Sequence, residues 1–235
     1  MASRPHDNAS AVGILDAHGI GYVYWYEYAL RHHGSTTMLF SLYLLVDSVP
    51  EAKSCLESAG WSPSSLPRFA PQYYDPDLDE AVVLSHVRNP EEKVVLMSAG
   101  PWPGISPTSS IARYPSLSQL YNALAQRALD TESLRFRQYL HLQLAYLYED
   151  CAELASSSFV GCLPRDIQQY HLDWRSGTLM MGNADTIRHE RAIRERARSG
   201  DWELMYQGTA ALGGTKIDRA YEASLLKGMA ESAAS

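Results

Sequence analysis

A glutamate surrounded by aromatic residues is the first feature that could do chemistry. Glu27 lies in YVYWYEY, residues 22–28, with Tyr24, Tyr26 and Tyr28 close to it in the sequence. A carboxylate can hold a planar guanidinium through two parallel hydrogen bonds, and aromatic rings can stack on the same group. We therefore expect Glu27, Tyr24 and Tyr26 to recognise a cationic substrate. The alternative for Glu27 is an exposed carboxylate or a helix cap.

Two further acids and a histidine lie beside aromatic residues in the second half of the chain. Glu149 follows Tyr148, and Asp173 precedes Trp174, so both acids are candidates for substrate binding. His171 is a candidate for acid–base catalysis with Asp173. Residues two apart on a helix do not face each other, so that pair would need tertiary partners. The alternative is that His171 caps or tethers its helix.

A run of arginines near the C-terminus could bind phosphates. In IRHERAIRERAR the spacings of three, three and four place four guanidinium groups on one helical face, a pattern that suits RNA. The alternative is a solvated helix in which Glu190 and Glu195 pair with the arginines. The candidate RNA-binding residues are Arg188, Arg191, Arg194 and Arg198.

The first hundred residues alternate between helical and strand patterns that would position these groups. Polar starters and glycine stops mark the helices, whereas aromatic, β-branched or continuous apolar runs mark the strands. NPEE, residues 89–92, has the chemistry of a hairpin turn. The sequence predicts helices at 7–19, 27–34 and 49–60, strands at 22–26 and 38–46, and a hairpin at 81–100.

The rest of the chain is predicted to be helical after a linker. Residues 101–115 are rich in proline, serine and glycine, and Ser116 with Gln119 then forms a capping-box pattern. We predict helices within 116–130, 131–155, 163–177 and 183–208, and a frayed tail after Glu222. The domains are thus a sheet-containing core at 1–100, a linker at 101–115 and a helical domain at 116–235, which makes the fold class α+β.

Composition and charge restrict the class of protein. The chain has 235 residues, 46% of them hydrophobic, which allows a real core, and no run of 18 apolar residues that could span a membrane. Its start lacks the apolar stretch of a secretory signal, so we expect a soluble, cytoplasmic protein. Three cysteines without a CxxC pair indicate neither a disulfide framework nor a zinc site. The formal charge of −7 argues against a surface that coats nucleic acid such as DNA.

The first half resembles the nucleotidyltransferase fold, and in particular diverged fungal members of it. In those enzymes a glycine pair follows the first strand and two metal-binding acids lie on the second. Here the glycine pair falls on Tyr26 and Glu27, and the acids fall on Ser41 and Tyr43. A third acid has no counterpart in KVVLMSAG, residues 93–100. The strings LAYLYED and YHLDWRSG in the second half support the same resemblance.

This resemblance implies a mixed sheet with flanking helices followed by a helical bundle, but not the family's reaction. Without the acids, metal-dependent nucleotidyl transfer is not expected, and no metal site is expected. Ser41 and Tyr43 occupy the two acid positions, so the resemblance implies that both side chains point into the former active site. Ser41 is then a candidate nucleophile. The alternative is a small buried serine bonded to backbone.

The chain is also similar in size, and in its lack of a metal site, to fungal arginine-containing cyclodipeptide synthases. Those enzymes take aminoacyl groups from transfer RNA and join arginine to a second amino acid as a diketopiperazine. The similarity implies aminoacyl-tRNA, including arginyl-tRNA, as substrate and no cofactor. The catalytic candidates are then Glu27, Ser41, Tyr43 and His171.

Two other classes of function stay open. One is a noncatalytic protein that keeps the transferase fold and binds a ligand or partner. The other is an enzyme of secondary metabolism that acts on a small molecule without transfer RNA. Each would use the same aromatic, carboxylate-bearing site, so the requirement for transfer RNA separates them from a cyclodipeptide synthase.

Overall fold

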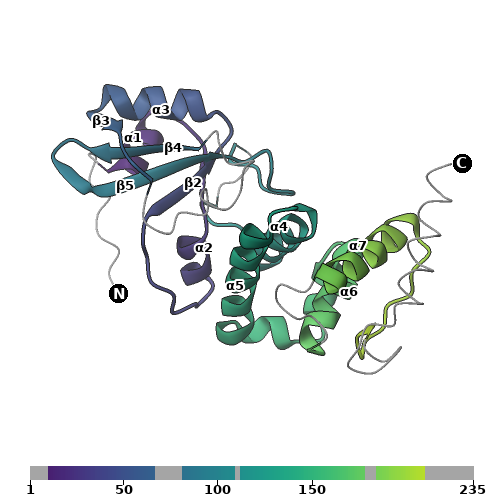
Figure 1. Cartoon of the computed structure of the whole chain (residues 1–235). Helices are drawn as coiled ribbons and strands as arrows, with labels where there is room; N and C mark the ends of the chain where they lie inside the picture. The colour runs from purple at the N-terminus through teal and green to yellow at the C-terminus, as the bar shows by residue number, and fades with distance from the viewer. Residues whose placement is uncertain (1–9, 67–80, 109–111, 178–183, 210–235) are drawn as a thin grey trace, which may run out of the picture. The chain divides into compact units, whose positions relative to one another are not determined.

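The computed structural model of the chain describes residues 10–66, 81–108, 112–177 and 184–209. The chain divides into two compact units, Met1–Ala123 and Leu124–Ser235, and the division falls within helix α4 (Leu117–Asp130). The described part of the first unit holds all the described strands, and that of the second is helical. The expected α+β class is therefore confirmed (Figure 1).

Within its described residues, the first unit is built on a five-stranded mixed sheet with the strand order β1-β2-β5-β4-β3. The pair β2 and β5 is parallel, with Tyr43 opposite Val95, and the other neighbouring pairs are antiparallel. The strands are β1 (Tyr22–Tyr24), β2 (Leu42–Val46), β3 (Trp61–Pro63), β4 (Val82–His86) and β5 (Asn89–Ser98).

Helices α1 (Ala11–Ala17) and α3 (Val49–Ser58) cover one face of this sheet (Figure 1). Leu44 and Val46 of β2 join their apolar side chains in one buried cluster. Because side chains alternate along a strand, Tyr43 and Leu45 point to the opposite face. Both are buried there as well, so β2 is covered on its two sides.

The predicted helix starts agree with the observed caps. The hydroxyl of Ser48 accepts a hydrogen bond from the amide of Glu51 at the start of α3. Ser116 and Gln119 form the reciprocal capping box of α4, in which each side chain accepts from the other residue's amide. Gly34 follows α2 (Glu27–His32) with φ +100°, so the glycine stop is also confirmed.

Two strand predictions were wrong in their extent. The hairpin turns at residues 87–88, and NPEE belongs to β5, where residues 89–92 are exposed and lie beyond the part paired with β2. Pro90 lies where the pairing of β5 with β4 is irregular, a position at which proline is tolerated. The second strand begins at Leu42 rather than at Met38, because β1 and β5 pair only with residues 42–46.

Residues 101–115 connect the sheet to α4 and, where described, pack within the first unit. Trp102 is buried, and the amide of Thr108 donates to the carboxylate of Asp47. The amide of Tyr24 donates to the carbonyl of Arg113. Proline and glycine therefore shape a segment that contributes to the core of the unit.

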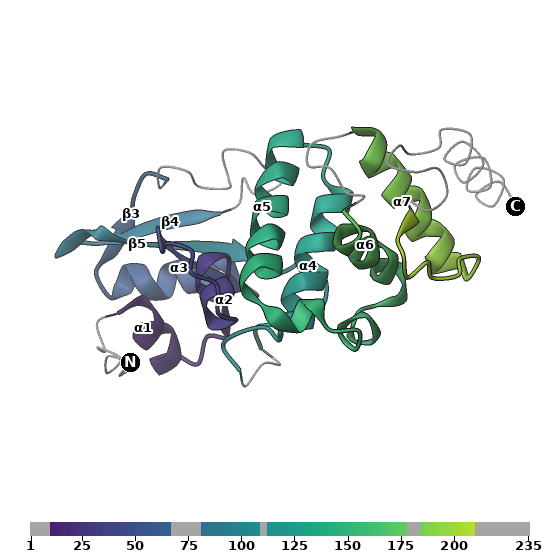
Figure 2. The same ribbon diagram turned by 90° about the horizontal axis from the view of Figure 1, so that it is seen from below.

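The described part of the second unit contains the end of α4 and three further helices, with two short 3-10 turns between the first two of them. Helices α6 and α7 lie side by side in both views (Figure 1, Figure 2). Within the described residues, none of the helices combines the length and the apolar character needed to cross a membrane. The tail after Glu222 lies outside the described residues. The remaining elements are α5 (Leu134–Asp150), η3 (Ala152–Ala155), η4 (Phe159–Cys162), α6 (Arg165–Arg175) and α7 (Ala184–Ser199).

Candidate functional site

The turn between β1 and α2 has an unusual backbone. Tyr26 has φ +47° and ψ −122°, and among the described residues other than glycine it alone has a positive φ. This region is one that glycine occupies without penalty and that costs another residue about 1–3 kcal/mol. It falls where the resemblance places the glycine pair. The predicted strand 22–26 ends at Tyr24, so Trp25 and Tyr26 belong to this turn.

Aromatic packing holds the turn in that conformation. Tyr26 and Trp25 are fully buried, and each ring lies edge-on to Trp102, with ring centroids 5.8 and 4.7 Å from it. The Tyr26 ring also meets Tyr43 edge-on at 5.3 Å. The amide of Trp25 donates to the carbonyl of Tyr43 at 3.0 Å. The sequence did not indicate Trp102 as part of this cluster, because it lies in the predicted linker.

Glu27 is the acid of this cluster. It is the first residue of α2 and only 6% exposed, so its carboxylate lies inside the first unit at a helix N-terminus, where negative charge is favoured. Burial and the negative charge of Glu27 raise the pKa of the Tyr43 phenol. The phenol is therefore neutral and able to donate a hydrogen bond. A buried carboxylate, a neutral phenol and several aromatic rings thus belong to the same part of the first unit, and the role of Glu27 in recognising a substrate stays a prediction.

Ser41 and Tyr24 are placed differently from this cluster. Ser41 is largely buried but precedes the first residue of β2, so the pleat of the strand does not fix its direction. Tyr24 stacks on Tyr114 and Tyr28, with ring centroids 4.6 and 5.7 Å away. Burial and the neighbouring Tyr114 raise the pKa of Tyr24 to about 12. Tyr24 is therefore part of an aromatic stack, and its role in substrate binding stays a prediction.

In the second unit His171 is tethered to α5. Its Nδ1 lies 2.6 Å from the Tyr148 hydroxyl, the two rings are stacked, and the histidine is fully buried. Burial, and then the positive charge of Arg175, lower the pKa of His171 to about 4. The imidazole is neutral near pH 7 and is a weak base. These contacts fit the alternative in which His171 tethers its helix.

Asp173 and Glu149 have contrasting surroundings. Asp173 is fully buried; its Oδ1 accepts from Gln169 Nε2 at 2.9 Å and from the Thr209 amide at 2.7 Å. Its Oδ2 accepts from the Thr209 hydroxyl at 2.9 Å. Glu149, near the C-terminal end of α5, is exposed. The hydrogen bonds of the Asp173 carboxylate are thus made to groups of the protein, whereas Glu149 faces solvent. The role of both acids in substrate binding stays a prediction.

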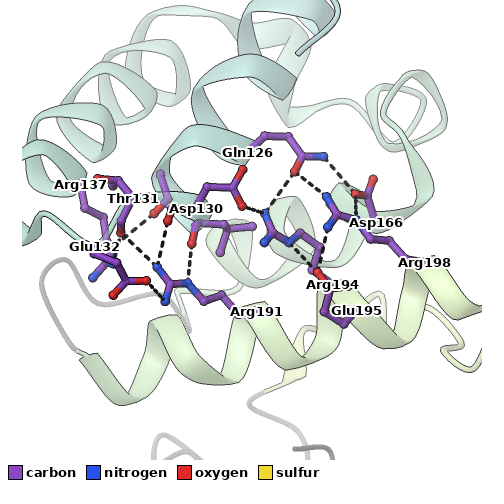
Figure 3. A network of polar contacts seen from close by, with 12 residues as sticks. Gln126, Asp130, Thr131, Glu132, Arg137, Asp166, Arg191, Arg194, Glu195 and Arg198 are labelled. Atoms are coloured by element: carbon purple, nitrogen blue, oxygen red, sulfur yellow. Dashed lines mark hydrogen bonds and ion pairs between the residues drawn. The ribbon is translucent and has the colours of Figure 1, made fainter. Parts of the chain in front are cut away.

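Three arginines of the predicted face of α7 bind groups of the protein itself (Figure 3). Arg191 donates to the carbonyls of Leu129 and Thr131 and pairs with Glu132 at 2.8 Å. Arg137 of α5 donates to the same Thr131 carbonyl at 2.5 Å. The carbonyls at the C-terminal end of α4, which have no partner within their own helix, are thus satisfied by two guanidinium groups.

Arg194 and Arg198 continue the same network (Figure 3). Arg194 is 8% exposed and pairs with Asp130 at 2.7 Å, and it donates to Gln126 at 3.2 Å. Arg198 pairs with Asp166 at 2.8 Å and shares the Gln126 oxygen at 3.1 Å. Three of the four predicted RNA-binding residues therefore connect α7 to other elements of its own unit.

Three other charged residues of α7 differ in their exposure and in their partners. Arg188 is exposed. Glu195 pairs with Arg198 at 2.8 Å, as the alternative predicted, whereas Glu190 is buried with Asp173 and makes no ion pair with the arginines. A pocket of about 310 Å³ in the same unit is lined by Val160, Leu172, Arg175 and Tyr206, among others.

No family model, no curated protein and no solved structure matches the chain. The fold and the two clusters described above are therefore the basis for any functional proposal.

Proposed function

We propose that the chain is an aminoacyl-tRNA-dependent cyclodipeptide synthase that joins arginine to a second amino acid, on a diverged nucleotidyltransferase-like fold. The observation that carries the proposal is the buried carboxylate of Glu27, which begins α2, follows the strained Tyr26 and acts electrostatically on the Tyr43 phenol. A carboxylate can bind a planar guanidinium through two parallel hydrogen bonds. The guanidinium of an arginyl group is a cation of the required shape.

The aromatic rings beside Glu27 favour a guanidinium over an ammonium. Guanidinium is planar and weakly hydrated, so it gains from stacking and from two parallel hydrogen bonds. The neutral phenol of Tyr43 can donate to a carbonyl or to the carboxylate of Glu27. We assign arginine recognition to Glu27 and orientation of the substrate to Tyr43.

The reaction that this site would support needs no cleavage of a nucleotide, because the ester to transfer RNA is already activated. The amine of one aminoacyl group attacks the ester carbon of the other, an amide forms, and the ribose hydroxyl leaves with the proton. A second amide bond then closes the six-membered ring and releases the other transfer RNA. In each step the proton passes from the attacking amine to the leaving ribose hydroxyl; Ser41 is the candidate that relays it, while Glu27 holds the guanidinium.

A second function is favoured by the arginine network. Because Arg191, Arg194 and Arg198 are bound to protein groups, the proposal does not use them as an RNA surface. A small-molecule enzyme or binding protein that needs no transfer RNA would use the same Glu27 cluster. The test must therefore separate a requirement for transfer RNA from a requirement for arginine.

The first experiment is a reconstitution with the purified full-length protein, arginine, the other amino acids, ATP, transfer RNA and aminoacyl-tRNA synthetases. We expect an arginine-containing cyclic dipeptide by mass spectrometry that disappears when ribonuclease is added. A new arginine-derived mass that survives ribonuclease would support the second function. No new mass, with charging of the transfer RNAs verified, would refute the proposed synthase.

Glu27→Gln tests the assigned residue, because glutamine has the same shape but no charge. Losing a charge-assisted hydrogen bond costs about 1.5–3 kcal/mol, so we expect product formation to fall about 10- to 100-fold. Glu91→Gln is the matched control, because Glu91 is exposed on β5. Equal activity of the two variants, both folded by circular dichroism, would remove Glu27 from the site.

A further inference from the structure

A second group of titratable side chains lies buried between α6 and α7, and the proposed function does not use it. It consists of Asp173 on α6 and of His189 and Glu190 on α7, each no more than 2% exposed. One possible ligand atom from each residue lies within 4.8 Å of those of the other two. The site therefore brings two carboxylates and an imidazole together inside the second unit.

Glu190 lacks the hydrogen bonds that buried carboxylates normally have. In the described part of the chain no donor lies within hydrogen-bond reach of either of its oxygens. The carboxylate of Asp173 lies beside it, with a ligand oxygen of each residue within 4.8 Å of the other. Two adjacent buried carboxylates cannot both stay ionised without a cation. The pair therefore needs either a shared proton or a metal ion.

The surroundings of Asp173 are those of an oriented ligand. Gln169 and the amide of Thr209 donate to Oδ1, and the hydroxyl of Thr209 donates to Oδ2. Carboxylates that bind metals are commonly held by such donors from neighbouring residues. These three hydrogen bonds therefore fix the orientation of the Asp173 carboxylate.

Thr209 also determines the form of His189. Its hydroxyl lies 3.2 Å from His189 Nε2. Because that hydroxyl gives its proton to Asp173, it accepts a proton from Nε2, and the Nδ1 atom of the ring then carries the lone pair. A histidine that donates from one nitrogen and ligates through the other is the usual arrangement at metal sites.

We propose that Asp173, His189 and Glu190 bind one divalent transition-metal ion, most readily zinc, which holds α6, α7 and the segment at Thr209 together. One nitrogen and two carboxylate donors suit zinc, and also manganese. A dication would neutralise both acids and fill the coordination that Glu190 lacks. The site has a structural purpose, because its three side chains are buried. This inference is independent of the proposed synthase.

The test uses the untagged full-length protein, incubated with zinc chloride or, separately, manganese chloride and then freed of excess metal by gel filtration. We expect about one metal ion per chain by elemental analysis and a melting temperature that chelator lowers by several degrees. Glu190→Gln should lose the bound metal and the response to chelator. Glu203→Gln, at an exposed glutamate of the same unit, should keep both.

The shared proton is the competing arrangement, and it gives the opposite result. A glutamine at position 190 can donate its amide to Asp173, so Glu190→Gln would then be at least as stable as the wild type. Wild-type protein without metal after loading, and with a melting temperature unaffected by chelator, overturns the proposal. If Glu190→Gln does not fold, Thr209→Val provides a milder change, which should weaken metal retention without removing a ligand.

Discussion

At the scale of single residues, the turn at Tyr26 combines a backbone suited to glycine with a large buried side chain. The edge-on contacts of Tyr26 with Tyr43 and Trp102 stabilise a conformation that is unfavourable by itself. Such strain persists only where the surrounding packing maintains it, and it is common at ligand sites. The turn therefore connects the fold of the first unit to the position of Glu27.

Replacing Tyr26 by alanine and by glycine separates the side chain from the backbone. Both variants lose the ring, but only glycine relieves the positive φ. We expect Tyr26→Gly to be more stable than Tyr26→Ala by about 1–2 kcal/mol in urea unfolding. Ala29→Gly inside α2 is the control, and there glycine should be less stable than alanine by about 1 kcal/mol. An equal loss of unfolding free energy in Tyr26→Gly and Tyr26→Ala would show that the positive φ of residue 26 is not strained.

His141 predicts how the stability of the second unit depends on pH. It is buried on α5, its Nε2 lies 3.0 Å from the Tyr170 hydroxyl, and its ring meets Trp174 edge-on. Burial, and then the charge of Arg137, lower its pKa to about 4. A base with a lowered pKa binds its proton more weakly in the folded state. The contribution of His141 to the free energy of unfolding is therefore complete at pH values above the pKa of this histidine in the unfolded chain. It is lost as the pH falls toward 4, because protonation then favours the unfolded state.

The expected loss is about 2 kcal/mol between about pH 7 and about pH 5, on linkage grounds. His141→Gln should flatten this part of the curve of unfolding free energy against pH, relative to the wild type. The comparison isolates His141 from other groups, because only the difference between the two curves is used. Parallel curves for the two proteins would show that His141 is not held neutral.

At the scale of elements, the C-terminal end of α4 is the point at which α5, α6 and α7 are joined by polar contacts. Arg194 is the most buried of the three α7 arginines in this network, and Gln126 accepts from both Arg194 and Arg198. Removing a buried partner from such a network leaves other groups unsatisfied. The arrangement predicts a structural effect of substitution before any effect on binding.

We expect Arg194→Ala to lower the free energy of unfolding by about 1–3 kcal/mol. Arg135→Ala, at an exposed arginine on α5, should change it by less than about 0.5 kcal/mol. Arg194→Lys keeps the charge but cannot reach two partners at once, so its effect should be intermediate. Unchanged melting of Arg194→Ala together with weaker RNA binding would instead assign Arg194 to a ligand.

Sequence patterns predicted the elements of this chain better than the directions of its side chains. The capping box of Ser116 and Gln119 was found because capping depends on local spacing. The hairpin turn was misplaced because the register of β4 and β5 depends on their pairing across the sheet. The spacing of the arginines indicated one face of α7, but what that face contacts depends on tertiary structure. For the same reason the alternative that pairs Glu190 with the arginines does not describe its buried position beside Asp173.

At the scale of the whole molecule, net charge limits how the chain could bind transfer RNA. The formal charge is −7, and three of the four stripe arginines are occupied by acids and carbonyls of their own unit. Each phosphate contact made by a cation adds about 0.9 to the slope of log affinity against log salt. The three arginines held in this way can therefore add little to RNA binding.

Transfer RNA binding by the full-length protein should consequently depend only moderately on salt. We expect a log–log slope no steeper than about −3 between low and physiological potassium chloride, measured by fluorescence anisotropy. Arg188→Gln should reduce the magnitude of the slope by about 0.9, the contribution of one phosphate contact. Arg194→Gln should leave the slope unchanged at a temperature where this variant is folded. A steeper slope that declines equally with each arginine substitution would mean that the network opens on binding and that the stripe is the RNA surface. No binding at any salt concentration would leave the Glu27 cluster as a site for a free small molecule, because the cluster itself does not depend on RNA.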